Sequence, residues 1–248
     1  MSPADLTHDQ LQALSAGAAY LAAFLLTSIG VWLAARGLRS RHTPFSVGVR
    51  HWPHWPTVGR AASLLASVGY PYMMVLTAAF SAGDVGLTPV DWAASLPWAV
   101  TLVAGGAVWV GALWGSHLRR AGVARTHGSW LSVAVDILAN EGTAAIARGT
   151  LIPFAGPYWG IWLAPLAKML AARANPHLNA RLNRAGERES VYLGWALDWL
   201  AAVVFAFGAG IWGALAARLV GSVAAEVAAR VAVPRAPAVS SEEASPSL

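Results

Sequence analysis

The sequence predicts an all-α, polytopic integral membrane protein, a bundle of about seven transmembrane helices. Three observations lead to this fold class. Of the 248 residues, 56% are hydrophobic and only 12% are charged, whereas about a quarter of the residues of an average soluble domain are charged. The apolar residues form long runs, about the length that crosses a bilayer as a helix. The chain also holds 13 Trp, a residue that is enriched at membrane–water interfaces.

Each expected helix is an uncharged or nearly uncharged run that ends at polar or basic residues. The run 190–233 is too long for one crossing at about 1.5 Å per residue, and Gly208 and Gly210 offer a turn that divides it in two. Pro71 is expected to kink the second helix, because proline removes a backbone hydrogen bond. The expected spans are 11–35, 61–83, 92–117, 129–149, 158–172 and the two halves of 190–233.

Arginine-rich loops follow the first, third and fifth expected spans. Because basic loops stay on the cytoplasmic side, the N-terminus is expected outside and the C-terminus inside a bacterial plasma membrane. Residues 1–233 are predicted to form one transmembrane domain, and 234–248, rich in Pro, Ser and Ala, a disordered tail. The basic residues lie beside spans, so nucleic acid is not an expected partner. The chain has no Cys, which excludes disulfides and thiolate metal sites.

The fourth expected span carries charges within an apolar run, namely Asp136, Glu141 and Arg148. Charged groups in a bilayer are costly and usually face a partner inside the bundle. Glu141 and Arg148 share one helix face, so we expect them to pair, with Asn140 or Thr143 satisfying the remaining carboxylate lone pairs. Asp136 lies closer to the basic end of the span and is expected near the interface.

A second buried acid, Asp198, is expected in the sixth span. It is a candidate for a proton relay or a partner of Arg148. Pairing with Arg218 across the turn near Gly208 requires two antiparallel helices in matching register, so it is the less expected arrangement. The predicted polar anchors of the bundle are therefore Asp136, Glu141, Arg148, Asp198 and Arg218.

Histidine occurs in two places that resemble ligand sites. The segment HWPHWP, 51–56, holds two imidazoles, but its prolines favour an extended interfacial loop and no carboxylate or Cys lies nearby. His117 ends the third span and is interpreted as an interfacial side chain. No His lies deep in an expected span, so neither a metal nor a cofactor is predicted.

Two segments resemble motifs of the CPBP family, the CAAX-protease and bacteriocin-processing type of intramembrane protease. ARGTLIP, 147–153, resembles the Arg-Gly-x-x-x-Pro end of the family's first motif, and GAGIWGALAARLVGS, 208–222, resembles its late segment. The resemblance covers roughly 128–225 and implies a CPBP-like helical core. The family's site residues are largely replaced: its two glutamates by Thr143 and Ala144, its late His by Arg218 and the partner of that His by Ser222. The middle His has only Met169 or Arg173 in its place, so the resemblance implies a degenerate member without most catalytic residues.

The leading hypothesis is a non-catalytic membrane subunit or scaffold that packs against other transmembrane proteins in the bilayer. One alternative is an active glutamate-dependent CPBP-type peptidase with Glu141 and Arg148 as its catalytic residues. The other is a small proton-coupled transporter that uses Asp198 and Glu141.

Overall fold

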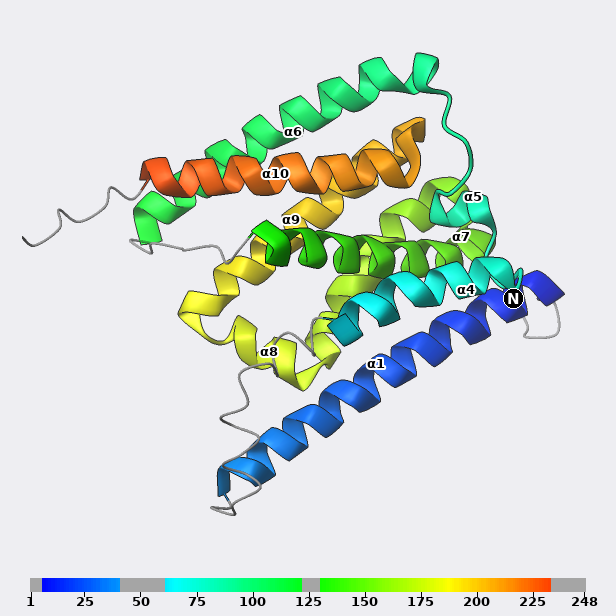
Figure 1. Ribbon diagram of the computed structural model, residues 1–248, viewed down its shortest axis with the longest axis horizontal. Coiled ribbons are helices and arrows are strands. Elements are labelled where there is room, and N and C mark those ends of the chain that lie inside the picture. The colour runs from blue at the N-terminus through cyan, green and yellow to red at the C-terminus, as the bar shows by residue number, and fades with distance from the viewer. Residues whose placement is uncertain (1–5, 41–60, 122–129, 233–248) are drawn as a thin grey trace, which may run out of the picture.

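The computed structural model describes residues 6–40, 61–121 and 130–232, and every regular element in these ranges is helical (Figure 1). Along the chain lie α1 (His8–Ser40), the π-helical turn η2 (Leu65–Gly69), α4 (Tyr70–Leu76), the one-turn α5 (Ala82–Val85) and α6 (Trp92–Ala121). They are followed by α7 (Trp130–Ala174), α8 (Pro176–Leu182), α9 (Ala185–Val204), the π-helical turn η3 (Phe205–Ala209) and α10 (Gly210–Ala232). The all-helical fold class is confirmed. The segment HWPHWP and the expected tail 234–248 lie outside the described residues.

Three segments of the described residues are long and apolar enough to cross a membrane: His8–Leu33, Trp92–Arg119 and Glu187–Ala232. The last is 46 residues long and contains most of α9 and all of α10. The expected number of about seven spans is therefore not confirmed, although a membrane helical bundle is consistent with these segments. The expected second span, 61–83, is wrong in extent, because its helix ends at Leu76 and a turn follows.

Helix α7 consists of two helical segments, which we call arms, separated by a kink. Gly156 has non-helical angles, φ 76° and ψ 166°, at a kink inside the helix. The second arm folds back on the first, since a Cβ added to Gly160 would lie 2.6 Å from the Cα of Ile152. We call residues 130–155 the first arm and 157–174 the second arm. The break expected between the spans 129–149 and 158–172 is confirmed at Gly156, but the helix continues past residue 149 and through Pro153.

The second hairpin joins α9 to α10 through η3. Gly208 (φ 84°) and Gly210 (φ 56°) adopt positive φ, which glycine reaches without the steric cost of a side chain. The turn predicted there is confirmed. A backbone hydrogen bond from Ile211 N to Gly86 O, 3.1 Å long, fixes this turn to the end of α5.

Three apolar clusters of the described residues hold the helices together. The largest lies between α6, α9 and α10 and includes Trp114, Leu118 and Val204, and α10 runs beside α6 in Figure 1. Gly111 and Gly115 of α6 lie against Ala224 and Ala228 of α10, so small residues allow this close approach. A second cluster joins α1, α4, α5 and the first arm of α7. The third joins both arms of α7 to α9, η3 and α10.

Substitution of Gly142 tests how closely η2 packs on α7. A Cβ at this position would lie 2.1 Å from the carbonyl oxygen of Ser67, a contact that only a backbone shift relieves. Gly142→Ala is expected to destabilise the fold by about 1–3 kcal/mol, the usual cost of overpacking. Thermal unfolding of the detergent-solubilised protein measures the effect. Gly105→Ala is the matched control, because nothing lies within 4 Å of its Cβ position, and an equal loss in both variants would contradict the packing.

Candidate functional site

The pairing of Glu141 with Arg148 is confirmed. Arg148 Nη2 donates to Glu141 Oε1 over 2.5 Å, and the two residues lie seven apart on the first arm of α7. Both are fully enclosed, with side chains 1% and 2% exposed for Glu141 and Arg148. A buried ion pair of this kind depends on its geometry, because neither partner retains water as an alternative.

Arg218 of α10 binds the other carboxylate oxygen of Glu141. Its Nε donates to Glu141 Oε2 over 2.7 Å, and its Nη1 lies 2.6 Å from Asp198 Oδ1 of α9. Asp198 and Arg218 are equally far from Gly208 along the chain, so an antiparallel α9–α10 hairpin brings them level. Pairing of Asp198 with Arg218, the arrangement that the sequence disfavoured, is therefore present.

Lys168 on the second arm of α7 completes the group. Its Nζ lies 2.6 Å from Asp198 Oδ1 and donates to the backbone oxygen of Asn140 over 3.0 Å. Lys168 lies within the fifth expected span, 158–172, but it is not among the predicted polar anchors; the helix itself continues to Ala174. We call Glu141, Arg148, Lys168, Asp198 and Arg218 the central charge cluster. It links four helical segments: both arms of α7, α9 and α10.

The expected roles of Asn140 and Thr143 are wrong. The second oxygen of Glu141 binds Arg218 instead of either of them. Thr143 Oγ1 donates to the carbonyl of Ala139 in its own helix. Asp136 is exposed on α7, unlike the buried Glu141 and Arg148.

Arg148 has a second contact besides Glu141. Its guanidinium carbon lies 3.9 Å from the centroid of the Phe205 ring, a cation–π geometry. Phe205 belongs to the π-helical turn between α9 and α10. The first arm of α7 therefore contacts the α9–α10 hairpin at two places: at the turn through Arg148 and Phe205, and midway along α10 through Glu141 and Arg218.

No group of three or more His, Asp, Glu or Cys that could hold a metal ion occurs in the described ranges. Ala144, which stands at one of the family's glutamate positions, is buried, as is Ser222 on α10. The positions of the family's site residues are therefore filled by apolar, hydroxyl and guanidinium side chains.

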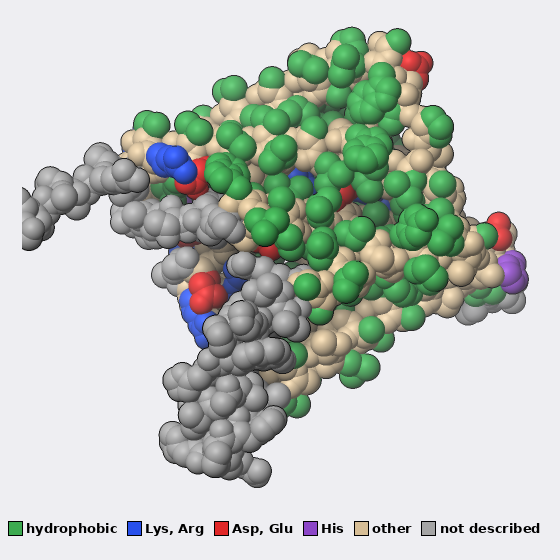
Figure 2. Space-filling view, in the orientation of Figure 1, with side chains coloured by type: hydrophobic (Ala, Val, Ile, Leu, Met, Phe, Trp, Pro, Cys, Tyr) green, Lys and Arg blue, Asp and Glu red, His purple; other side chains and the backbone are tan. Residues whose placement is uncertain are grey.

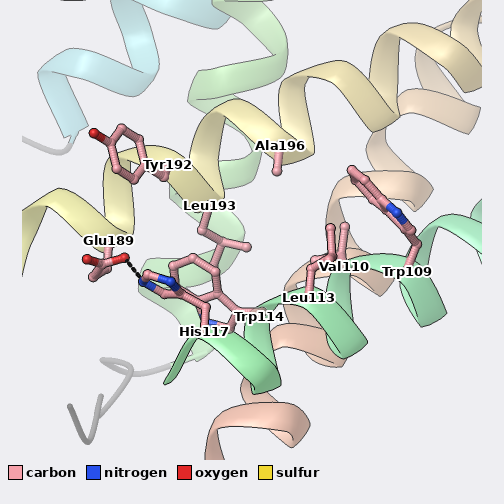
Figure 3. A pocket seen from close by; sticks show the side chains of 9 residues that line it. All are labelled: Trp109, Val110, Leu113, Trp114, His117, Glu189, Tyr192, Leu193 and Ala196. Carbon is pink, nitrogen blue, oxygen red and sulfur yellow. Dashed lines mark hydrogen bonds and ion pairs between the residues drawn. The ribbon is translucent and has the colours of Figure 1, made fainter. Parts of the chain in front are cut away.

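A pocket lies elsewhere, between α6 and α9, with a cavity volume of about 230 Å³ (Figure 3). We call it the α6–α9 pocket. Its walls are mostly apolar and aromatic, and at one end His117 Nε2 contacts Glu189 Oε2. The lining residues are Trp109, Val110, Leu113, Trp114, His117, Glu189, Tyr192, Leu193 and Ala196.

The His117–Glu189 pair is a polar contact that sequence reasoning missed. His117 is half-exposed, as expected of an interfacial side chain, but Glu189 is buried, with 7% of its side chain exposed. Arg188 Nε lies 3.6 Å from the other oxygen of Glu189. Helical periodicity alone does not show that α6 and α9 are neighbours, so no signal in the sequence joins these residues.

No protein-family model, curated protein or solved structure matches the chain.

Removing one acid from the central charge cluster tests its contribution. Asp198→Asn leaves Lys168 and Arg218 without their shared carboxylate, and the loss of one partner from a buried pair costs about 3–5 kcal/mol. The free energy of unfolding in detergent is expected to fall by that amount. Asp198→Asn combined with Lys168→Met is expected to recover part of the loss, because it removes a cation together with the acid.

Glu187→Gln is the control for this experiment. The Glu187 carboxylate pairs with Arg181 and Arg184 and is 40% exposed, and exposed pairs contribute about 0–1 kcal/mol. If Asp198→Asn were as mild as Glu187→Gln, the cluster would contribute little to stability.

Proposed function

We propose that this chain is an integral protein of a bacterial plasma membrane that acts as a non-catalytic helical subunit or scaffold for other transmembrane proteins. The observation that carries the proposal is the binding of both buried acids by cations. Each oxygen of Glu141 binds an arginine, and Asp198 contacts Lys168 and Arg218 through one oxygen. These carboxylates hold helices together.

Catalysis by Glu141 would require different surroundings. A general base needs hydrogen-bond access to the proton that it removes, directly or through one water. Glu141 is 1% exposed and paired at both oxygens, and the α6–α9 pocket is lined by none of the cluster residues. The peptidase hypothesis therefore has no supporting contact at Glu141.

The CPBP-like core is part of the proposal. Arg148 and Arg218 occupy the aligned positions of the family's arginine and late histidine, and both bind Glu141. An arginine in place of an imidazole turns a water-activating arrangement into a closed ion-pair group, because arginine stays protonated and only donates hydrogen bonds. The binding of both arginines to Glu141 supports a pseudoprotease-like origin for the scaffold.

Two features support placement in a membrane: the depth of the buried charges below the turn at Gly208, and the apolar outer surface. Asp198 and Arg218 would lie roughly 15 Å below the turn at Gly208, from about 1.5 Å per residue, near the middle of a hydrocarbon core of about 30 Å. Charges at that depth normally pair inside the protein. Figure 2 shows hydrophobic side chains over most of one face, with charged side chains at its edges and a few deep between the helices near its middle.

The outer faces of several helices supply large apolar side chains for partner helices. Among them are Leu65 at 74% exposure, Val108 at 73% and Leu131 at 75%. These side chains lie on η2, α6 and α7, so contact with a neighbouring chain is available on more than one side. Lipid tails and partner helices both suit such surfaces, so crosslinking must distinguish the two.

A diazirine analogue of leucine placed site-specifically distinguishes partner contact from lipid contact. At Leu131, illumination of native membranes is expected to give a defined protein adduct that mass spectrometry identifies as another transmembrane chain. Leu118 is the control, because it is 0% exposed and should give only adducts within the chain. Lipid adducts alone, at Leu131, Val108 and Leu65 together, would contradict the scaffold.

Cleavage tests the peptidase alternative in the same membranes. Peptides released by membranes with the wild-type protein are compared with those released by Glu141→Gln, with Asp198→Asn as a control for lost stability. The scaffold predicts the same peptides in all three. Products that vanish in Glu141→Gln and persist in Asp198→Asn would show an enzyme.

A further inference from the structure

The central charge cluster does not balance its own charge. Arg148, Lys168 and Arg218 supply three cations, whereas Glu141 and Asp198 supply two carboxylates. All five side chains are largely buried, the most exposed being Lys168 at 11%. An uncompensated charge removed from water is expensive, so one unit of negative charge is missing from this group.

The central charge cluster also lacks hydrogen-bond acceptors for two guanidinium nitrogens. Arg148 Nε and Arg218 Nη2 are buried and have no hydrogen-bond partner among the described residues. Both guanidinium groups bind the one carboxylate of Glu141, so these donors belong to side chains that meet at a single point. A buried donor left without an acceptor is disfavoured by about 1–3 kcal/mol.

Loss of a proton from Lys168 would correct the charge imbalance but not the missing hydrogen-bond acceptors. The charge would balance, but the N–H groups of Arg148 and Arg218 would still lack acceptors, because arginine does not lose its proton in proteins. An anion corrects both deficits at once. It supplies the missing negative charge and accepts the unpaired N–H groups.

We propose that Arg148 and Arg218 bind one small monovalent anion of the chloride class, with Arg148 Nε and Arg218 Nη2 as donors. Burial favours a small ion over an organic acid, since both arginine side chains are only 2% exposed. The ion makes the cluster neutral. This role is independent of the scaffold function and holds for any activity of the chain.

An ion that binds the folded state and not the unfolded state raises the unfolding temperature with its concentration. The full-length protein in non-ionic detergent is titrated with sodium chloride against sodium gluconate at constant ionic strength. The unfolding temperature is expected to rise with chloride, to rise with bromide in its place, and to stay unchanged with gluconate alone. Equilibrium dialysis with radioactive chloride is expected to give one ion bound per chain.

Two variants at one position separate charge from other effects. Lys168→Met leaves two cations and two carboxylates, so chloride binding is expected to weaken at least tenfold. Lys168→Arg keeps the extra cation and is expected to keep the chloride dependence. If Lys168→Met does not fold, the dialysis of the wild-type protein still decides the question.

Three results would overturn the proposal. One is an unfolding temperature that is the same in chloride and gluconate, with no ion bound by dialysis. Another is a chloride response that is equal in Lys168→Met and the wild-type protein. The third is stability that changes with pH through Lys168 alone, without any halide effect, which would show that the cluster is neutralised by proton loss.

Discussion

A carboxylate that leaves water needs cations at close range, and in this chain two carboxylates find three cations on four helical segments. Glu141 lies on the first arm of α7, Lys168 on the second arm, Asp198 on α9 and Arg218 on α10. Apolar packing alone tolerates small slides of one helix along another. The ion pairs do not, because a shift of one residue would turn a charged group away from its partners and leave it buried. The charges therefore determine the register of the two hairpins.

The turns make this register possible. Gly156 reverses α7, and Gly208 and Gly210 reverse the chain between α9 and α10, all at positive φ. The reversal at Gly208 places Asp198 and Arg218, which are equally far from it along the chain, opposite one another. The reversal at Gly156 brings the second arm of α7 back along the first, where the long side chain of Lys168 reaches the backbone oxygen of Asn140. Arg148 against the Phe205 ring then connects the first hairpin to the turn of the second. Local backbone geometry and long-range electrostatics thus support the same arrangement.

Sequence reasoning reached what depends on local spacing. The pair Glu141–Arg148 follows from helical periodicity, and the reversals at Gly156 and Gly208 follow from residue type and from the length of the apolar run. It missed what depends on the relative positions of helices. The link from Arg218 to Asp198 and the contact of His117 with Glu189 both require knowing which helices are neighbours. Lys168 was missed for the same reason, because its acidic partner, Asp198, lies on another helix.

The coupling between Glu141 and Arg218 tests most directly whether charges hold the two hairpins together. It is obtained from the free energies of unfolding of the wild-type protein, Glu141→Gln, Arg218→Met and the double variant. We predict that the two losses are far from additive, with a favourable interaction of at least about 1.5 kcal/mol, the lower range measured for close charge pairs. Additive losses, with a coupling near zero, would show that the two side chains are neighbours without holding the bundle together.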